Sequence, residues 1–312
     1  MRVRRKAIAA GIVIVLAATL SACGKVGELR ARQLLKDANS LYQAANYKEA
    51  AVKYEQVITN DPSVTIVFFY LGNSYDNMYK GKPGQPNNPD MLTKAIANYK
   101  LSIEREQDPQ LKKLSLQYLV NAYGPEKLND PSLAEPVVQD MIKLDPNDTT
   151  SYFVLSKIYE DAGNLDESEA VLKKAKDIQP KQPAVYQQLA GYYQRQGEFD
   201  KLIEAIQQRA VLEPSNPEAH YSIASYYWDE AYRNTRLNDQ QKRDYAAKGL
   251  EEVEKALQLK PDYVEAIVYK GLLLRIQAGI EKDAKKQQDL LTQAKALQEK
   301  AAELKNKQAS GV

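Results

Sequence analysis

Cysteine and histidine are almost absent from this chain of 312 residues, which holds one of each, Cys23 and His220. A single cysteine excludes an internal disulfide framework and any metal site built from several thiolates. The sequence offers His220 no second histidine, cysteine or clustered carboxylate that would complete a metal site or a catalytic triad. We therefore expect His220 to be a packed or half-buried ring, and we predict no catalytic residues, no metal and no cofactor.

The chain also lacks an excess of charge of one sign, with 43 basic and 41 acidic residues. Nucleic-acid-binding domains concentrate lysine and arginine because each phosphate contact releases bound counterions. Near-neutral and interspersed charge therefore argues against nucleic acid as a partner. It also offers no polybasic attraction to a membrane, so attachment to one would rest on acyl chains.

Long apolar runs are scarce, and the one at the N-terminus is short. Basic residues within positions 2–6 precede an uninterrupted small and apolar run over residues 7–20. A bilayer span needs about 20 apolar residues, so this run suits the core of a signal peptide better than a transmembrane helix. The sequence Leu20-Ser21-Ala22-Cys23 then supplies a cleavage site of small residues that ends in the cysteine.

This segment resembles the bacterial lipobox. The resemblance implies that residues 1–22 are a lipoprotein signal peptide, that Cys23 becomes the lipidated, palmitate-bearing first residue, and that residues 23–30 form a short tether. The alternative is a plain cleaved signal or an uncleaved anchor with an incidental cysteine. Gly24 stands where an Asp would retain a lipoprotein at the inner membrane of enteric bacteria, which favours the outer membrane.

What the chain does have is a 34-residue period. Pro146, Pro180 and Pro214 stand 34 residues apart, and such a period marks an array of similar units rather than one enzyme core. The residues between them repeat in kind: Tyr152, Leu155, Tyr159, Gly163, Ser168, Leu172 and Ala175, then Tyr186, Leu189, Tyr193, Gly197, Phe199, Leu202 and Ile206. At these spacings they resemble the tetratricopeptide repeat (TPR) pattern of two helices joined by a turn and closed by proline.

The TPR resemblance implies an all-α fold, a right-handed α-solenoid of antiparallel helix pairs over residues 31–280. Six repeats are recognisable and a seventh is worn, and residues 281–312 form a C-terminal capping helix and tail, with a short partner coiled coil as the alternative. One helix pair cannot bury its own apolar face, so stacking on neighbours must supply stability. We therefore expect Leu155, Leu189 and the tyrosines of the repeat slots to be core residues.

Two insertions interrupt the period, near residues 78–92 and 228–246. The first is rich in turn residues, and the second is a charged excursion that we expect to be helical. Each is either a tolerated surface loop or a contact site. Trp228, the only tryptophan, is the candidate interface anchor of the second insertion because it occupies no packing slot.

The resemblance also implies a concave surface lined by the first helix of each unit, where the family usually binds ligands. Asn39, Asn73 and Asn121 hold the same slot in three consecutive units, so their amides could grip the backbone of an extended peptide. The alternative is that these asparagines are solvated or locally bonded. The full groove hypothesis comprises Asn39, Tyr42, Phe69, Asn73, Asn77, Asn121, Phe153, Lys157, Gln187 and Tyr221.

Together these features favour a non-enzymatic scaffold that binds proteins or peptides of the bacterial cell envelope. It would be anchored in the membrane through Cys23 and would face the periplasm. Alternatives are an accessory factor in polysaccharide export or in cell-wall hydrolase regulation, and an undetected enzyme. The polysaccharide alternative requires Phe69, Phe153 and Tyr221 to line up as a stacking platform, and the enzyme alternative requires a polar cluster facing His220.

Overall fold

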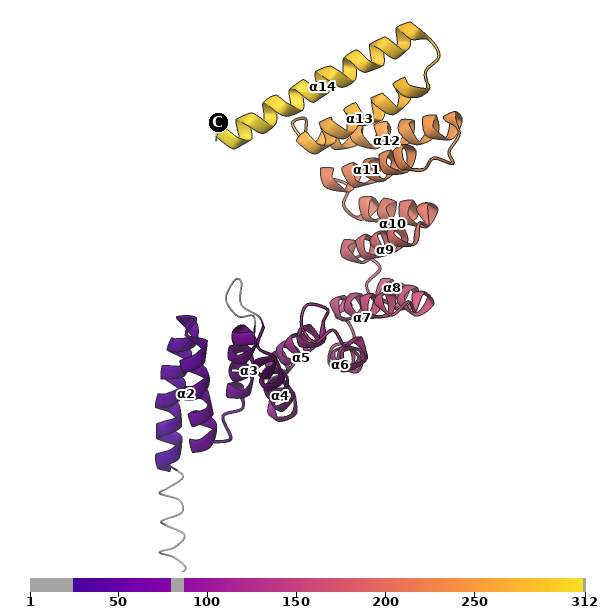
Figure 1. The fold of residues 1–312 in the computed structure, drawn as a ribbon. Coiled ribbons are helices and arrows are strands. Elements are labelled where there is room, and N and C mark those ends of the chain that lie inside the picture. The colour runs from indigo at the N-terminus through magenta and orange to yellow at the C-terminus, as the bar shows by residue number, and fades with distance from the viewer. Residues whose placement is uncertain (1–24, 80–86, 311–312) are drawn as a thin grey trace, which may run out of the picture. The chain divides into compact units, whose positions relative to one another are not determined.

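The structure is a computed structural model that describes residues 25–79 and 87–310, and every regular element in these ranges is an α-helix (Figure 1). The prediction of an all-α fold is therefore confirmed for the described part of the chain. The predicted signal peptide, Cys23 and residues 80–86 of the first insertion lie outside the described residues.

The helices gather in two compact units, one ending at Asn164 and the other beginning at Leu165. The boundary falls inside the predicted fourth repeat. In unit 1, a helix over residues 25–43 precedes α2 (Tyr47–Asn60), α3 (Ile66–Tyr79), α4 (Pro89–Arg105), α5 (Pro109–Tyr123), α6 (Pro131–Leu144) and α7 (Thr149–Asp161). Unit 2 holds α8 (Leu165–Ile178), α9 (Pro183–Gln196), α10 (Phe199–Leu212), α11 (Pro217–Arg233), α12 (Asp239–Leu259), α13 (Val264–Ile280) and α14 (Ala284–Ser310).

Capping aspartates, prolines and glycines determine where the helices begin and where the chain turns between them. Asp108, Asp130 and Asp148 each accept a backbone N–H of the helix that follows, and proline occupies the first turn of α5 and α6. A side-chain acceptor satisfies one of the unpaired donors at a helix start, and proline there loses no hydrogen bond. Gly163 and Gly197 adopt φ of 80° and 72° at the turns between the two helices of a repeat. A side chain in this left-handed conformation is strained, so glycine suits both turns.

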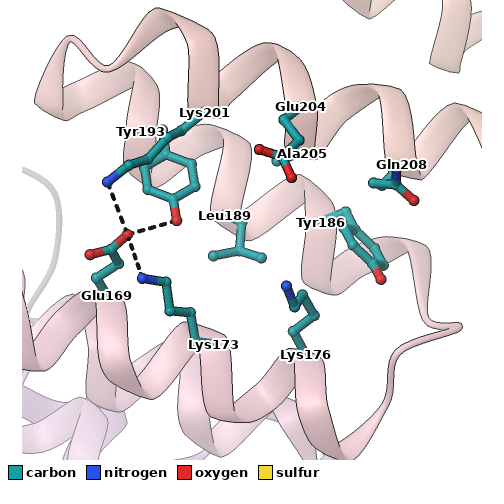
Figure 2. A pocket seen from close by; sticks show the side chains of 10 residues that line it. All are labelled: Glu169, Lys173, Lys176, Tyr186, Leu189, Tyr193, Lys201, Glu204, Ala205 and Gln208. Carbon is teal, nitrogen blue, oxygen red and sulfur yellow. Dashed lines mark hydrogen bonds and ion pairs between the residues drawn. The ribbon is translucent and has the colours of Figure 1, made fainter.

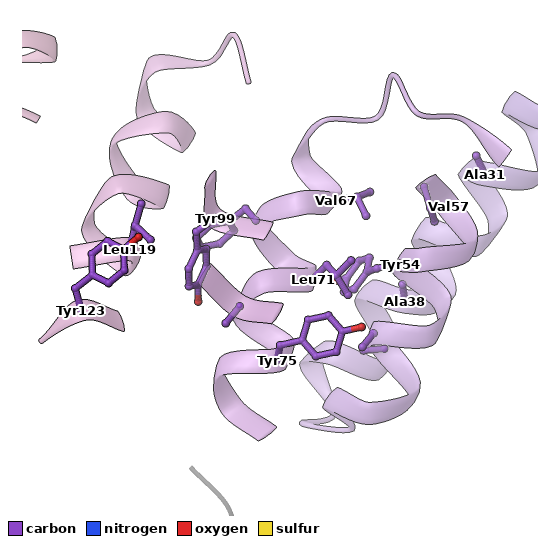
Figure 3. Packing of buried hydrophobic residues seen from close by; sticks show 14 of the residues in the cluster. Ala31, Ala38, Tyr54, Val57, Val67, Leu71, Tyr75, Tyr99, Leu119 and Tyr123 are labelled. Atoms are coloured by element: carbon purple, nitrogen blue, oxygen red, sulfur yellow. The ribbon is translucent and has the colours of Figure 1, made fainter. Parts of the chain in front are cut away.

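The core of unit 1 shows why the repeats must stack (Figure 3). Tyr54 and Val57 of α2 are fully buried, and they belong to one cluster with Val67 and Leu71 of α3 and with residues of α4 and α5. No pair of helices contains this cluster alone. Leu155 and Leu189 are buried as predicted. Two of the repeat-slot tyrosines, Tyr159 and Tyr186, are only half-buried, and the others are buried: Tyr75, Tyr99, Tyr123, Tyr152, Tyr193 and Tyr227.

The period reappears in the hydrogen bonds of the tyrosine hydroxyls. Tyr152 Oη donates to the carbonyl oxygen of Pro146 at 3.0 Å, and Tyr186 Oη donates to that of Pro180 at 2.8 Å. Each bond ties the start of a first helix to the end of the helix before it. Tyr152 is buried whereas Tyr186 is half-buried, and both hydroxyls have an acceptor, which a tyrosine removed from water requires.

The second insertion is not the separate excursion that the sequence predicted. Residues 217–233 and 239–259 are continuous helices, α11 and α12, and only a short turn separates them. The additional residues lengthen both helices of one pair. Asn238 and Gln241 cap the N-terminus of α12 with a capping box. Trp228 is therefore a residue of α11 rather than of an inserted loop.

The last helix, α14, packs along α13. Its buried residues Ala294 and Ala301 lie two turns apart on one face. Gly271 of α13 lies opposite, where an added Cβ would sit 3.4 Å from the carbonyl oxygen of Ala294. Small residues on both helices thus allow close approach, and α14 completes the seventh helix pair.

A glycine in α3 provides a test of this packing. An added Cβ at Gly72 would lie 2.9 Å from ring atoms of Tyr99 and 3.2 Å from the carbonyl oxygen of Ala95. Tyr99 is fully buried, so Gly72→Ala should lower the free energy of unfolding by about 1–3 kcal/mol, the usual cost of overpacking. Urea denaturation followed by circular dichroism measures this loss.

Gly191 in α9 is the matched control. The nearest atom to its added Cβ is the flexible Arg195 side chain at 3.4 Å. Gly191→Ala should therefore stabilise the protein by roughly 0.5–1 kcal/mol, because alanine favours a helix interior. Equal effects of the two substitutions would contradict the proposed close contact of α3 with α4.

Candidate functional site

Asn73, a predicted groove residue of unit 1, is hydrogen-bonded to other residues of the same unit. Asn73 is only 4% exposed. Its Oδ1 accepts from Tyr42 Oη at 2.6 Å and from Asn77 Nδ2 at 2.9 Å. Burial raises the pKa of Tyr42 to about 12, so this hydroxyl stays a donor. Asn73 is therefore locally bonded, as the alternative interpretation had it, and its amide oxygen is not available to grip a peptide.

The three asparagines of the shared slot also differ from one another. Asn39 Oδ1 accepts from the hydroxyl of the buried Tyr54 at 2.8 Å, whereas Asn121 is exposed on α5. The same repeat position therefore holds a half-buried acceptor, a buried acceptor and a surface amide. They do not form the uniform ladder that the sequence suggested.

Phe69 is a core residue rather than a groove residue. Its ring is buried and meets Tyr70 and Tyr118 edge-on, both at 5.3 Å between centroids. With its edges and faces enclosed by protein, the ring cannot stack on a ligand. The polysaccharide alternative therefore loses one of the three aromatic residues that it required.

The same helix, α3, holds one partner of a buried ion pair about two turns after Phe69. Lys127 Nζ, from the turn between α5 and α6, lies 2.7 Å from Asp76 Oδ1, and the two side chains are 7% and 5% exposed. Tyr99 Oη donates to Asp76 Oδ2 at 3.3 Å, and burial followed by the Asp76 charge raises the pKa of Tyr99. Removing one partner of such a pair leaves an uncompensated buried charge, which typically costs about 3–5 kcal/mol. These groups stabilise unit 1 and are not available to a ligand.

The other predicted groove residues are spread over both units. In unit 1, Phe153 is half-buried and the exposed Lys157 pairs with Asp161 along α7. In unit 2, Gln187 accepts a hydrogen bond from the Arg209 guanidinium. Gln187 is therefore not the free surface residue that the sequence suggested.

Two residues that the sequence assigned to rival sites come together in unit 2. Tyr221 of the predicted groove packs edge-on against Tyr269 of α13, with 5.3 Å between ring centroids. Trp228 meets the same Tyr269 ring edge-on at 5.4 Å and stacks on Tyr232 at 5.1 Å, with 10° between the ring planes. We call Tyr221, Trp228, Tyr232 and Tyr269 the aromatic surface. Tyr221 of the predicted groove and Trp228 of the predicted insertion thus belong to one surface on α11 and α13.

The aromatic surface keeps part of its rings in solvent. Tyr232 is 64% exposed, and Val268 beside Tyr269 is also exposed. Burial and the neighbouring tyrosines raise the pKa of Tyr221 to about 12, so the hydroxyl remains neutral and can donate. Trp and Tyr combine a large apolar ring with one polar group, a combination enriched at protein interfaces. The sequence analysis missed Tyr232 and Tyr269, because only folding places them against Trp228.

A second feature of unit 2 is a cleft of about 250 Å³ between α8, α9 and α10 (Figure 2). Lys173 and Lys176 line it from α8, and Glu204 and Gln208 from α10. The lining residues of α9 are Tyr186, Leu189 and Tyr193. We call this feature the α8–α10 cleft. None of its polar residues was predicted as a site residue.

Glu169 holds three side chains in place at one end of the α8–α10 cleft. Its Oε1 accepts from Tyr193 Oη at 2.8 Å and lies 3.0 Å from Lys173 Nζ and 3.3 Å from Lys201 Nζ (Figure 2). Burial acts to raise the pKa of Glu169, but the hydrogen bonds from Lys173, Tyr193 and Lys201 outweigh it and lower that pKa. Glu169 therefore remains ionised and fixes these donors in place.

Glu169 repeats an arrangement found in unit 1. There, Tyr159 Oη donates to Glu135 Oε1 at 3.0 Å, and both residues lie one 34-residue period before Tyr193 and Glu169. Tyr75 likewise donates to Glu55. The spacing of the two glutamates was the signal in the sequence that would have identified Glu169 as the partner of a repeat-slot tyrosine.

His220 has a partner that the sequence did not reveal. Its Nδ1 lies 2.7 Å from Glu252 Oε2 of α12, and Lys255 Nζ lies 2.8 Å from Glu252 Oε1. The ring is half-buried as expected, and Glu252 with Lys255 forms a polar cluster that faces it, as the enzyme alternative requires. Within the described residues no group of three or more His, Cys, Asp and Glu side chains is arranged to hold a metal ion. The contacts seen here join α11 to α12.

Comparison with known proteins agrees with this architecture. Residues 127–191, from the turn before α6 into α9, match the family model of the tetratricopeptide repeat. This segment of the chain is therefore similar to tetratricopeptide repeats. No curated protein matches it.

Solved structures extend the TPR fold beyond the matched residues. The C-terminal part of a TPR repeat-containing protein from Cytophaga hutchinsonii is 15% identical, with a TM-score of 0.58, and the match covers 86% of this chain and 98% of that one. The MamA protein is 20% identical over 64% of this chain and 94% of its own, with a TM-score of 0.44. YrrB, a TPR protein with an unusual peptide-binding site, is 19% identical over 76% and 90%, with a TM-score of 0.36. At these identities the likeness shows the fold alone. Only the first of these three structures has a TM-score above 0.5, and the fold assignment rests on that one.

No helix within residues 25–79 and 87–310 is long and apolar enough to cross a membrane. The lipobox-like segment lies outside these ranges.

The environments of the asparagines yield a direct prediction. Asn73→Ala removes the acceptor of Tyr42 Oη and should lower the free energy of unfolding by about 1–3 kcal/mol, the cost of leaving a buried polar group unpaired. Asn121→Ala, on the exposed surface of α5, should change it by no more than roughly 0.5 kcal/mol. Denaturant melts of both variants test the contrast. Equal stability of the two would show that the hydrogen bonds of Asn73 contribute nothing.

Proposed function

We propose that this TPR protein is a scaffold that binds a protein partner through the aromatic surface of unit 2. The observation that carries the proposal is the exposed Tyr232 ring stacked on Trp228. Exposed aromatic groups that are already held by neighbouring rings lose little conformational entropy on binding. Tyr and Trp in such positions often dominate the energy of an interface.

The choice of unit 2 follows from how polar groups are used in each unit. In unit 1, Asn39, Asn73 and Asp76 are hydrogen-bonded to tyrosines or lysine of the fold. A partner would have to break these bonds before forming its own. In unit 2, the rings of Tyr232 and Trp228 contact each other and still present area to solvent, so binding adds contacts without removing any.

We further propose that the scaffold is tethered to the bacterial envelope by lipid on Cys23 and faces the periplasm. The proposal rests on the basic head, the apolar run over residues 7–20 and Leu20-Ser21-Ala22-Cys23. The short stretch between Cys23 and the first described helix would keep unit 1 near the membrane. A partner of the envelope is the corresponding expectation for the aromatic surface.

Site-specific photo-crosslinking in cells tests the aromatic surface. A photoreactive phenylalanine analogue in place of Tyr232 should give a discrete adduct with a protein partner. The same analogue in place of Val211, a 69% exposed residue of α10, serves as the control and should give none. Tyr232→Ala should weaken binding of the captured partner by about 2 kcal/mol, roughly thirtyfold. Adducts at Val211 but not at Tyr232 would place the interface elsewhere.

Metabolic labelling with a palmitate analogue tests the tether separately. The wild-type protein should incorporate label and sediment with membranes, whereas Cys23→Ser should remain unlabelled and unprocessed, because serine has no thiol to accept the lipid. Circular dichroism of the purified variant should show an unchanged helical content. Acylation of the Cys23→Ser variant would disprove the assignment without affecting the proposal for Tyr232.

A further inference from the structure

We infer that the α8–α10 cleft is a second binding site, which takes a peptide segment bearing a carboxylate side chain next to an apolar one. The site is separate from the aromatic surface, since it is formed by α8, α9 and α10 and shares no residue with it. It does not depend on the proposed function of the aromatic surface.

The first argument is the unused charge on the basic wall. Lys176 is half-buried on α8 and faces the cleft (Figure 2), yet it has no ion-pair partner among the described residues. Lys173 on the same wall already pairs with Glu169. An ammonium without an ion-pair partner gains from a carboxylate that reaches it, because hydrogen bonds between charged groups are the strong ones.

The opposite wall has the complementary character. Glu204 and Gln208 of α10 face the cleft across from the lysines (Figure 2), and neither has a described hydrogen bond. Glu204 offers acceptors and no donor, and Gln208 offers an acceptor and two donors. An extended peptide running between the walls would turn a carboxylate toward Lys176 and backbone N–H groups toward Glu204 and Gln208.

The floor of the cleft selects an apolar neighbour for that carboxylate. Leu189 lies between the two walls in Figure 2, with the Tyr186 ring beside it. The Tyr186 hydroxyl already donates to the Pro180 carbonyl, so its ring, not its polar atom, is left for contact. An apolar side chain placed on Leu189 and Tyr186 would be removed from water, which is favourable.

The size of the cleft limits the ligand. Its volume of about 250 Å³ is below the roughly 300–1,000 Å³ of pockets that enclose drug-sized molecules and cofactors. The cleft therefore suits one or two side chains of a longer chain. Tyr193, Lys173 and Lys201 are fixed by Glu169, so this end of the site is preformed.

An array of immobilised, end-capped hexapeptides tests the inference. The two central residues run through all pairs of amino acids between glycine and serine flanks, and the full mature protein is the probe. Wild-type protein should bind best to pairs that join Asp or Glu to an apolar residue. Titration of the best peptide and its amide twin, with Glu replaced by Gln or Asp by Asn, should show about a tenfold or greater preference for the carboxylate.

Lys176 variants identify the site. Lys176→Ala should lose the acidic preference, and Lys176→Arg should keep it because the charge remains. Tyr232→Ala, which alters the aromatic surface, should leave the array pattern unchanged. Absence of signal above the glycine and serine background, equal binding of the carboxylate peptide and its amide twin, or an acidic preference that survives Lys176→Ala would each overturn the inference.

Discussion

The structure depends on one constraint: a pair of helices has too little partner surface to bury its own apolar face. Tyr54 and Val57 of α2 are fully buried in a cluster that also contains Ala38 of the first helix and Leu71 of α3. This helix pair is thus completed by its neighbour. Stability then approximates a sum of local interfaces rather than the property of one central core, and the surfaces left over at each interface become available for binding.

The use of tyrosine as the main core aromatic has a consequence for those surfaces. Each buried or half-buried ring brings a hydroxyl that needs an acceptor, and the chain supplies acceptors of more than one kind. Tyr152 and Tyr186 use proline carbonyls, whereas Tyr159 and Tyr193 use glutamates of the preceding helix. In unit 1 the hydroxyl of Tyr42 instead donates to the side-chain oxygen of Asn73. Asn73, which the repeat pattern assigns to ligand binding, is therefore engaged in the packing of unit 1.

Unit 2 retains two surfaces of different chemistry. The aromatic surface offers stacked rings, and the α8–α10 cleft offers an ammonium and a carboxylate on facing walls. A scaffold with both can hold one partner by burial of rings and recognise a segment by charge. The TPR fold does not itself specify either role, because function belongs to the individual sites.

The sequence by itself determined the repeat architecture, since the prolines at 34-residue spacing and the tyrosine and leucine slots are local signals that recur. It correctly placed Leu155 and Leu189 in the core and His220 in a half-buried position. Only the tertiary structure decided which slot residues are free. Phe69 and Asn73 are buried because neighbouring tyrosines close over them, and Trp228 joins Tyr269, far along the chain, because α11 and α13 pack together. A repeat pattern gives each residue its helix face, but the neighbouring helix, whose side chains differ from unit to unit, determines whether that face is covered.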